Sequence, residues 1–119
     1  MGAGVMITCK NRVLLLQRNK DLTWNCAGGS SEKGESRYQT AIREMNEEIT
    51  NVPPHLKIVN HYGTNGYTLY HGILRDIFYP MINDESIDWR WVRFSEIPKY
   101  KIHPKDRNHM QYLLREMFE

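Results

Sequence analysis

Residues 29–51, GSSEKGESRYQTAIREMNEEITN, join a glycine-rich turn to a helix-forming segment that carries clustered carboxylates. Positions three and four apart are neighbours on a helix, so Glu44, Glu47 and Glu48 lie close together on one face. Apolar side chains recur at helical spacing on a different face, which predicts an amphipathic helix packed on a core. That apolar set comprises Tyr38, Ala41, Ile42, Met45 and Ile49.

A cation is expected beside a helix face that carries three acids, because it would offset the repulsion between their charges. Like charges at this spacing destabilise a helix by roughly a few tenths of a kcal/mol per pair. Mg²⁺ prefers oxygen ligands and is held by a few carboxylates together with water and substrate phosphates. Arg43, four residues before Glu47, is placed to pair with it, and Arg37 lies along the same side, within reach of a phosphate. For an isolated acidic run, a solvated helix face would be the alternative.

The acids do not stand alone, and their setting closely resembles the signature of the Nudix hydrolases. In that signature a glycine is followed by a glutamate, and then by Arg-Glu, an aliphatic residue, any residue and Glu-Glu. The matching positions are Gly29, Glu35, Arg43, Glu44, Met45, Glu47 and Glu48. The signature normally closes with a glycine and an aliphatic residue, where this chain has Thr50 and Asn51. The departure concerns how the helix ends, because a glycine there usually supplies the left-handed cap.

The resemblance implies an α/β fold, the Nudix-type α/β/α sandwich, with a mixed β-sheet flanked by helices. It also implies hydrolysis of a pyrophosphate bond in a nucleoside diphosphate derivative, with Mg²⁺ as cofactor and Mn²⁺ as a substitute. The metal ligands that it implies are the Gly29 carbonyl, Glu44, Glu47 and Glu48. Glu35 and Arg43 resemble the family's supporting pair, which orients the carboxylates.

The general base and the residues that recognise the substrate are less closely defined. Glu44 and Glu85 are the two candidates for the base, and Glu85 is either a late functional acid of the family or a plain surface acid. Tyr67 and Tyr70 follow the motif at about the place where dinucleoside polyphosphate hydrolases of the family carry a specificity tyrosine. Their parity differs, so a regular strand would turn at most one of them towards a pocket, and aromatic packing is the alternative.

The 119 residues predict a single domain, 1–119, with 40% hydrophobic and 25% charged residues and a net charge of +2. No apolar run is long enough to span a bilayer, so a cytoplasmic protein with no membrane partner is expected. Cys9 and Cys26 are expected to be buried thiols, with a disulfide as the alternative. The histidines lack zinc-ligand spacing against either cysteine.

Outside the motif, the pattern predicts strands, a helix and turns. Residues 4–9 and 12–18 read as a hairpin with a turn at Lys10 and Asn11, and Trp24 reads as a core residue. Two prolines after Val52 end the motif helix. The further predicted elements are strands over residues 56–62, 67–79 and 89–94, with a bulge at Gly72, a turn over 95–98 and a final helix from Pro104.

These observations favour a compact pyrophosphohydrolase that acts on an NTP, a dNTP or a dinucleoside polyphosphate. One alternative is a Nudix-fold nucleotide sensor without catalysis. Another is an RNA 5′-end pyrophosphohydrolase that uses the basic C-terminal stretch, in which case RNA binding would depend steeply on salt. That stretch comprises Lys99, Lys101, His103, Lys105 and Arg107. A homodimer is compatible with the sequence, which does not define the oligomeric state.

Overall fold

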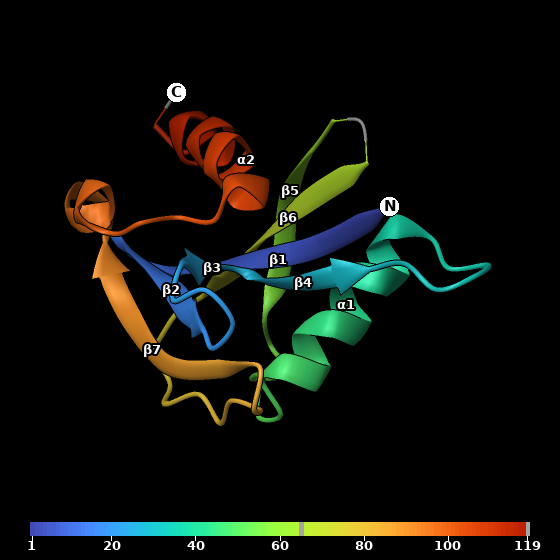
Figure 1. Ribbon diagram of the computed structural model, residues 1–119. Coiled ribbons are helices and arrows are strands. Elements are labelled where there is room, and N and C mark those ends of the chain that lie inside the picture. The colour runs from blue at the N-terminus through green and yellow to red at the C-terminus, as the bar shows by residue number, and fades with distance from the viewer. Residues whose placement is uncertain (65, 119) are drawn as a thin grey trace.

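The computed structural model of the protein describes residues 1–64 and 66–118, which form a seven-stranded sheet with helices on both sides (Figure 1). The strands are β1 (Gly2–Cys9), β2 (Arg12–Arg18), β3 (Trp24–Asn25), β4 (Ala27–Ser30), β5 (Lys57–Thr64), β6 (Tyr67–Leu74) and β7 (Ser86–Arg93). The helices are α1 (Arg37–Glu48), the 3₁₀-helix η1 (Phe94–Lys99) and α2 (Pro104–Glu116).

Strand β1 lies at the centre of the sheet. It runs parallel to β6 from Gly2, beside Tyr67, to Cys9, beside Leu74. On its other edge, the first half of β1 pairs antiparallel with β4, and its last residues pair with β2. Strand β5 extends the sheet through β6, and β3 and β7 both pair with β2. The sheet is therefore mixed, as predicted.

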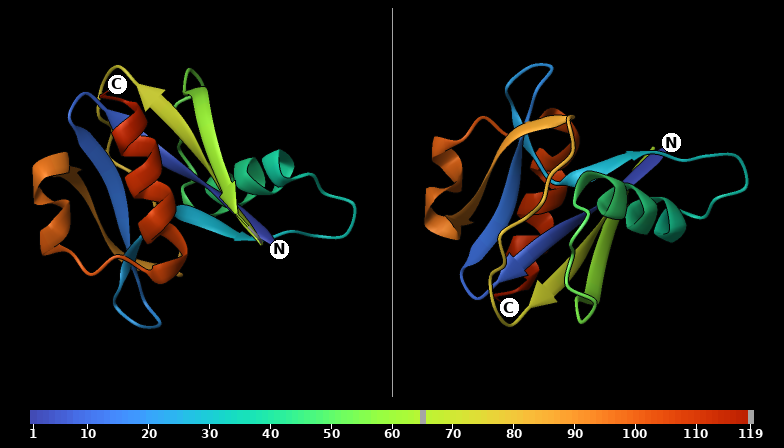
Figure 2. Two further views of the ribbon diagram at one scale, coloured as in Figure 1. Left: turned by 90° about the horizontal axis from the view of Figure 1, so that it is seen from above. Right: turned by 90° about the horizontal axis from the view of Figure 1, so that it is seen from below.

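The two α-helices cover opposite faces of this sheet (Figure 2). Val5 and Ile7 of β1 pack in the core on the α1 side, which also contains Met45. Met6, between them in sequence, packs in the core on the α2 side with Leu113. Successive side chains of a strand point to opposite faces, so β1 contributes to both cores. This arrangement confirms the predicted α/β/α sandwich.

Helix α1 begins with a capping box. The Ser36 hydroxyl accepts a hydrogen bond from the Gln39 N–H, and the Gln39 side-chain oxygen accepts one from the Ser36 N–H. These contacts satisfy backbone donors that the first turn leaves without a helical partner. From there the apolar stripe faces the sheet, and Ala41, Met45 and Ile49 are buried as predicted.

Two predictions about the faces of α1 are wrong. Tyr38, in the first turn, is 48% exposed, and its ring meets that of Tyr70 edge-on at a centroid distance of 5.4 Å. The acidic face is also not separate from the core, since Glu48 is 5% exposed. Glu48 is the last residue of the helix and lies against β4, which covers it.

The end of α1 is held by the loop that follows β6 instead of by a glycine. Ile49 is extended, with φ −130°, and the Thr50 N–H donates to the Met81 carbonyl at 3.0 Å. The Asn51 side chain donates to the Tyr79 carbonyl at 3.0 Å and accepts from the Met81 N–H at 2.7 Å. Thr50 and Asn51, where the chain departs from the family signature, therefore tie the helix to this loop.

Several strand boundaries differ from the prediction. The predicted strand over residues 67–79 is too long, because the chain bends at Arg75 and Asp76 and β6 ends at Leu74. The register irregularity lies on β5, between Ile58 and Asn60, and not at Gly72 on β6. Strand β5 starts one residue later than predicted and continues to Thr64, and β7 spans Ser86–Arg93 in place of 89–94. The predicted turn over 95–98 is part of the 3₁₀-helix η1.

The predictions for the first hairpin, the two cysteines and Trp24 are confirmed. Strands β1 and β2 form the predicted hairpin, with Lys10 at φ 56° in its turn. Cys9 and Cys26 are buried free thiols. Trp24 is 8% exposed and meets the ring of Tyr100 edge-on, which confirms its place in the core. In the part of the chain that the structure describes, no helix is long and apolar enough to cross a membrane.

Candidate active site

The three motif carboxylates of α1 have different surroundings. Glu48 is buried, and its Oε2 accepts a hydrogen bond from the Gly28 N–H at 2.9 Å. The Glu44 side chain is 14% exposed and lies against Gly29, whereas the Glu47 side chain is 53% exposed. Helical spacing gathers the three on one side of α1, and β4 then buries two of them.

The absence of a side chain at Gly29 lets the carboxylate of Glu44 lie directly against the backbone of β4. A Cβ atom built on Gly29 would lie 2.5 to 2.7 Å from the carboxylate carbon and both carboxylate oxygens of Glu44. A Cβ on Gly28 would likewise overlap the hydroxyl of Tyr67. The two glycines of β4 thus allow side chains to approach the backbone closely, which is a common reason for glycine beside a binding site.

Arg43 joins the turn, the helix and β4. Its Nε donates to Glu35 at 2.7 Å, and its Nη1 donates to Glu44 at 3.1 Å. It also reaches Glu47 at 3.2 Å and the Ser30 carbonyl at 3.0 Å. The predicted pairing with Glu47 is confirmed, and so is contact between the predicted supporting residues Glu35 and Arg43. Hydrogen bonds, chiefly from Arg43, lower the pKa of Glu35 to about 2.

Burial makes Glu48 a strongly perturbed acid. The pKa of Glu48 is raised to about 8. Loss of solvent is the main cause, and the nearby charges of Glu85 and Glu44 act in the same direction. The Gly28 N–H and Lys105 act in the opposite direction. Burial also raises the pKa of Glu44, against the effect of Arg43. A carboxylate that is short of water and surrounded by other acids is stabilised in its charged form by a cation.

A polar cavity of about 370 Å³ opens beside Glu48. It is lined by Arg18, Asn19, Lys20, Asn25, Gly28, Glu48, Asp84, Glu85 and Lys105. Carboxylates and cations therefore share one cavity. This combination suits a metal-bound polyphosphate, because acids hold the metal and cations contact the phosphates.

Glu85, the second candidate for the base, is brought to this cavity by Asn83. The Asn83 amide nitrogen donates to the Glu47 carbonyl at 3.1 Å and to the Glu85 carboxylate at 3.2 Å. The Asn83 N–H also donates to the Glu48 carbonyl at 3.1 Å. Glu85, far from the motif in sequence, thus lines the same cavity as Glu48.

Sequence reasoning missed Asn25 and Asp106, and it placed Lys105 only in a basic stretch. Asn25 is 5% exposed, lines the cavity, and has an Oδ1 without a hydrogen-bond partner among the described residues. Lys105 also lines the cavity and pairs with the fully buried Asp106 at 2.7 Å. The position of Asn25 in the sequence, directly after Trp24 and shortly before the two glycines, was a signal that could have identified it. Nothing local in the sequence shows that the first turn of α2 meets Cys26, between β3 and β4.

The candidate substrate residues Arg37, Tyr67 and Tyr70 do not line this cavity. Arg37 donates to the Thr68 hydroxyl at 2.7 Å and to the Met1 sulfur at 3.0 Å. Tyr67 is packed against the α2 side of the sheet and Tyr70 against the α1 side, in keeping with their different parity. The Tyr67 hydroxyl instead lies beside two residues that do line it: it accepts from Lys105 Nζ at 3.4 Å, and it lies where a Gly28 side chain would extend.

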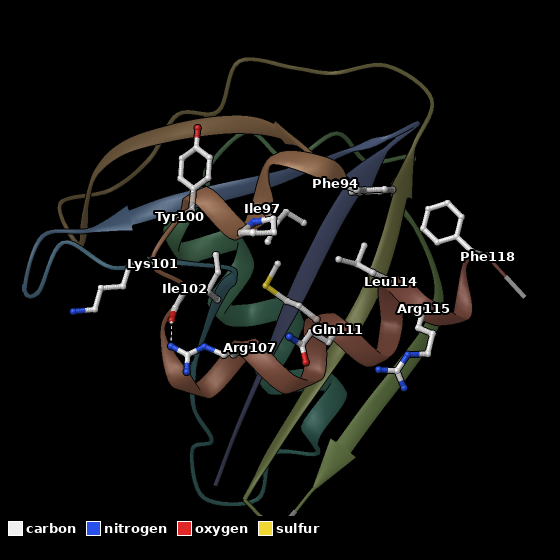
Figure 3. A pocket seen from close by; sticks show the side chains of 12 residues that line it. Phe94, Ile97, Tyr100, Lys101, Ile102, Arg107, Gln111, Leu114, Arg115 and Phe118 are labelled. Carbon is white, nitrogen blue, oxygen red and sulfur yellow. Dashed lines mark hydrogen bonds between the residues drawn. The ribbon is translucent and has the colours of Figure 1, made fainter.

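The basic C-terminal stretch is divided between different surroundings. Lys101 and Arg107 lie at an apolar groove of about 590 Å³ between η1 and α2, where Arg107 donates to the Ile102 carbonyl at 3.1 Å (Figure 3). Lys99 pairs with Glu96 at 2.6 Å. Of this stretch, only Lys105 lines the cavity beside Glu48.

The donor chemistry at the cavity fits a divalent cation of the Mg²⁺ type. Across residues 1–64 and 66–118, no three His, Cys, Asp or Glu side chains are already arranged as a metal centre, and Glu44 and Glu47 are instead turned to Arg43. Mg²⁺ does not need such a cage, because it is usually bound by one or two carboxylates plus waters and substrate phosphates. Glu48 and Glu85 supply carboxylates of this kind.

Comparison with solved structures shows the same fold in known proteins. A C. elegans Ap4A hydrolase in a binary complex superposes with a TM-score of 0.80 at 21% identity, over 98% of this chain and 96% of that chain. The E. coli dihydroneopterin triphosphate pyrophosphohydrolase superposes with a TM-score of 0.77 at 21% identity, over 96% of this chain and 94% of that chain.

Comparison of sequences identifies the family. A nucleoside triphosphate pyrophosphatase/Nudix hydrolase fusion protein of Bifidobacterium longum (strain NCC 2705) is 31% identical over 87 residues, or 67% of this chain. The match spans only 18% of that protein's length. The sequence profile of the NUDIX domain matches residues 1–113, which is nearly the whole chain. With the signature of α1 and the sandwich fold, this match shows that the chain belongs to the NUDIX domain family.

Proposed function

We propose that the protein hydrolyses a pyrophosphate bond in a nucleotide derivative with the help of a divalent cation, Mg²⁺ or Mn²⁺. The observation that carries the proposal is the cavity beside Glu48, where Glu85 and the cations Arg18 and Lys105 also lie. Breaking a phosphoric anhydride requires shielding of negative charge and a positioned water. A cavity with acids for the metal and cations for the phosphates provides both.

Glu44, Glu47 and Glu48, with the Gly29 carbonyl, are the proposed metal ligands. When bound there, the divalent cation neutralises phosphate charge and lowers the pKa of a coordinated water. Arg43 orients the carboxylates of Glu44 and Glu47 by hydrogen bonds, and Glu35 in turn accepts a hydrogen bond from Arg43. If Glu44 and Glu47 held the cation, the contact of Arg43 with Glu35 would still fix the guanidinium group.

Glu85 is the better candidate for the general base than Glu44. Glu85 lines the cavity, while Glu44 is packed against Gly29 and accepts a hydrogen bond from Arg43. A base must reach the attacking water, and a loop carboxylate on the cavity wall meets this requirement. The Glu85→Gln variant should lose turnover more than metal affinity, whereas Glu44→Gln should lose both.

The proposed substrates are NTPs, dNTPs and dinucleoside polyphosphates. The family members compared above carry names that refer to nucleoside triphosphates, Ap4A and dihydroneopterin triphosphate, all polyphosphate compounds. The cations on the cavity suit a chain of phosphates. Arg37, Tyr67 and Tyr70 stay predictions as substrate contacts, to be tested by substitution once the substrate is known.

Product analysis tests this function directly. The purified protein is incubated with Mg²⁺ and NTPs, dNTPs, ADP-ribose, nucleotide sugars, dinucleoside polyphosphates or triphosphorylated RNA. We expect turnover of one substrate class, its loss by orders of magnitude in Glu48→Gln, and its retention in Glu116→Gln on the far end of α2. A folded protein that binds the cation and turns over no substrate in the panel would instead indicate a nucleotide sensor.

A further inference from the structure

The chain changes partner strands at Cys26. Strand β3 pairs with β2, and β4 pairs with β1, so Cys26 between them belongs to neither pairing. Its backbone groups are bonded to side chains of α2 instead. The Cys26 N–H donates to Asp106 Oδ2 at 2.9 Å, and the Cys26 carbonyl accepts from Lys105 Nζ at 3.2 Å.

Lys105 and Asp106 form a compact pair at the start of α2. Their side chains meet at 2.7 Å, with Asp106 0% exposed and the Lys105 side chain 20% exposed. Pro104 at the helix start and His103, whose Nδ1 accepts the Lys105 N–H at 3.1 Å, fix this first turn. A buried ion pair often adds little to stability compared with apolar residues of the same volume. What this pair does provide is a fixed position for Cys26.

Two routes of contact lead from Lys105 to Gly28. One passes through the backbone of Cys26, which precedes Gly28 by two residues. The other passes through the Tyr67 hydroxyl, which accepts from Lys105 and occupies the place of a Gly28 side chain. Gly28 in turn donates its N–H to Glu48. The pair on α2 is thus connected to the proposed metal ligand on α1.

We propose that Lys105 and Asp106 are positioning residues that hold the glycines of β4 against Glu48 and thereby set the affinity of this site for a divalent cation. The inference rests on the metal site of the proposed function. It gives α2, on the other face of the sheet from α1, a role in cation binding.

The charge of Lys105 and its role in positioning have opposite effects on the affinity for a cation. Lys105 lines the same cavity as Glu48, so removing its positive charge alone would strengthen the binding of a cation. Removing a residue that orients a metal ligand typically weakens metal affinity by about 10 to 100-fold. The direction of the change therefore separates a positioning residue from a nearby charge.

The experiment measures Mn²⁺ binding to the nucleotide-free protein by electron paramagnetic resonance. Lys105→Met keeps the length of the side chain and removes the ammonium group. We expect its Mn²⁺ affinity to fall by about 10-fold or more. The matched control Lys57→Met, at an exposed position of β5, should bind Mn²⁺ like the wild type. Unchanged or tighter binding by folded Lys105→Met would overturn the proposal.

Two further variants cover the case in which Lys105→Met does not fold. Asp106→Asn keeps the volume and an acceptor for Cys26, and Tyr67→Phe breaks only the route through the hydroxyl. Asp106→Asn also removes a negative charge, which by itself weakens cation binding, so the decision rests on Tyr67→Phe, which changes no charge. Weakened Mn²⁺ binding in Tyr67→Phe supports the proposal, and wild-type binding in Tyr67→Phe overturns it.

Glu48→Gln separates a failure of the metal site from a failure of the positioning role. If it binds Mn²⁺ normally, the metal assignment fails and the positioning role fails with it. If it loses Mn²⁺ while the α2 variants do not, only the positioning role fails.

Discussion

Arg43 shows what a single residue can do in this fold. One guanidinium group contacts a carboxylate in the turn, two on α1 and the backbone of β4. Its planar fork of donors allows these contacts at the same time, which a lysine ammonium cannot reproduce. Arg43 therefore both builds the motif and keeps like charges apart.

The Arg43→Lys variant tests this role. We expect kcat/KM to fall by about 10-fold or more, because supporting contacts to metal ligands are lost. We also expect a lower Tm, because Glu35, Glu44 and Glu47 can no longer share one donor group. Steady-state kinetics and thermal unfolding measure the two effects. Arg115→Lys, at an exposed position of α2, is the control. Wild-type kinetics and Tm in Arg43→Lys would contradict the proposed role of Arg43.

His71 predicts a pH dependence of stability. Its Nε2 lies 2.7 Å from the Thr8 hydroxyl, and burial lowers the pKa of His71 to about 4. The unfolded chain, with an ordinary histidine pKa of about 6.5, takes up a proton that the folded protein excludes. Stability contributed by neutral His71 is therefore present above about pH 6.5 and is lost as the pH falls towards 4.

Denaturant unfolding at a series of pH values checks this expectation. The loss should reach about 3 kcal/mol at most, since one unit of pKa shift corresponds to about 1.4 kcal/mol. His71→Gln should remove this contribution, so its stability should fall less than that of the wild type as the pH drops from 6.5 to 4. The loss due to Glu35, whose pKa is lowered, should remain at more acidic pH. An unchanged slope in His71→Gln would show that other groups cause the effect.

At the scale of elements, the end of α1 and the loop over residues 75–85 act together. Asn51 binds the loop through both the nitrogen and the oxygen of its side-chain amide, and Asn83 of the loop donates a hydrogen bond to Glu85. The loop lacks regular structure, yet it places a carboxylate on the cavity wall. The side chain that replaces the usual aliphatic residue of the signature thus helps to form the site.

Asn51→Ala should therefore affect turnover more than stability. The lost hydrogen bonds are exposed and contribute about 1 kcal/mol each. We expect a several-fold lower kcat with a small change in Tm, because Glu85 is held less firmly. Asn108→Ala, exposed on α2, is the control. Asn51→Ala with full turnover would show that the loop keeps its position without Asn51.

Elements with a strong local pattern could be predicted from the sequence. The hairpin of β1 and β2, helix α1 and the acids of the motif all follow from periodicity and spacing. The bend at Arg75 could not be predicted, because residues 67–79 read as one β-rich run and the loop is fixed by contacts with the distant Asn51. Asn25 and Asp106 were missed for the same reason, since Asn25 lines a cavity with residues distant in sequence and Asp106 binds the backbone of the distant Cys26.

At the scale of the whole molecule, one sheet supports two cores. Each face is completed by one helix, and β1 contributes side chains to both. Because a shared sheet transmits the loss of either core to the other, the chain should unfold in one cooperative step. The site lies where both helices contact β4 or the residue that precedes it.

Leu113→Ala tests this cooperativity. Leu113 is 0% exposed on the α2 side, so its truncation should lower stability by about 2 to 5 kcal/mol. Circular dichroism and tryptophan fluorescence should report the same, lower midpoint. Separate transitions for the two signals would show that α2 detaches before the sheet unfolds. Leu22→Ala, at an exposed side chain, should have little effect.

The central place of β1 also has a consequence for the order of folding during synthesis. Strand β1 is synthesised well before its parallel partner β6, which begins at Tyr67. Until that segment has left the exit tunnel, one edge of β1 has no native partner, and pairing over such a long stretch of chain is slow. The carboxylates of α1 are thus translated before the sheet that arranges them is complete, and the cavity can be complete only after Lys105 has left the tunnel.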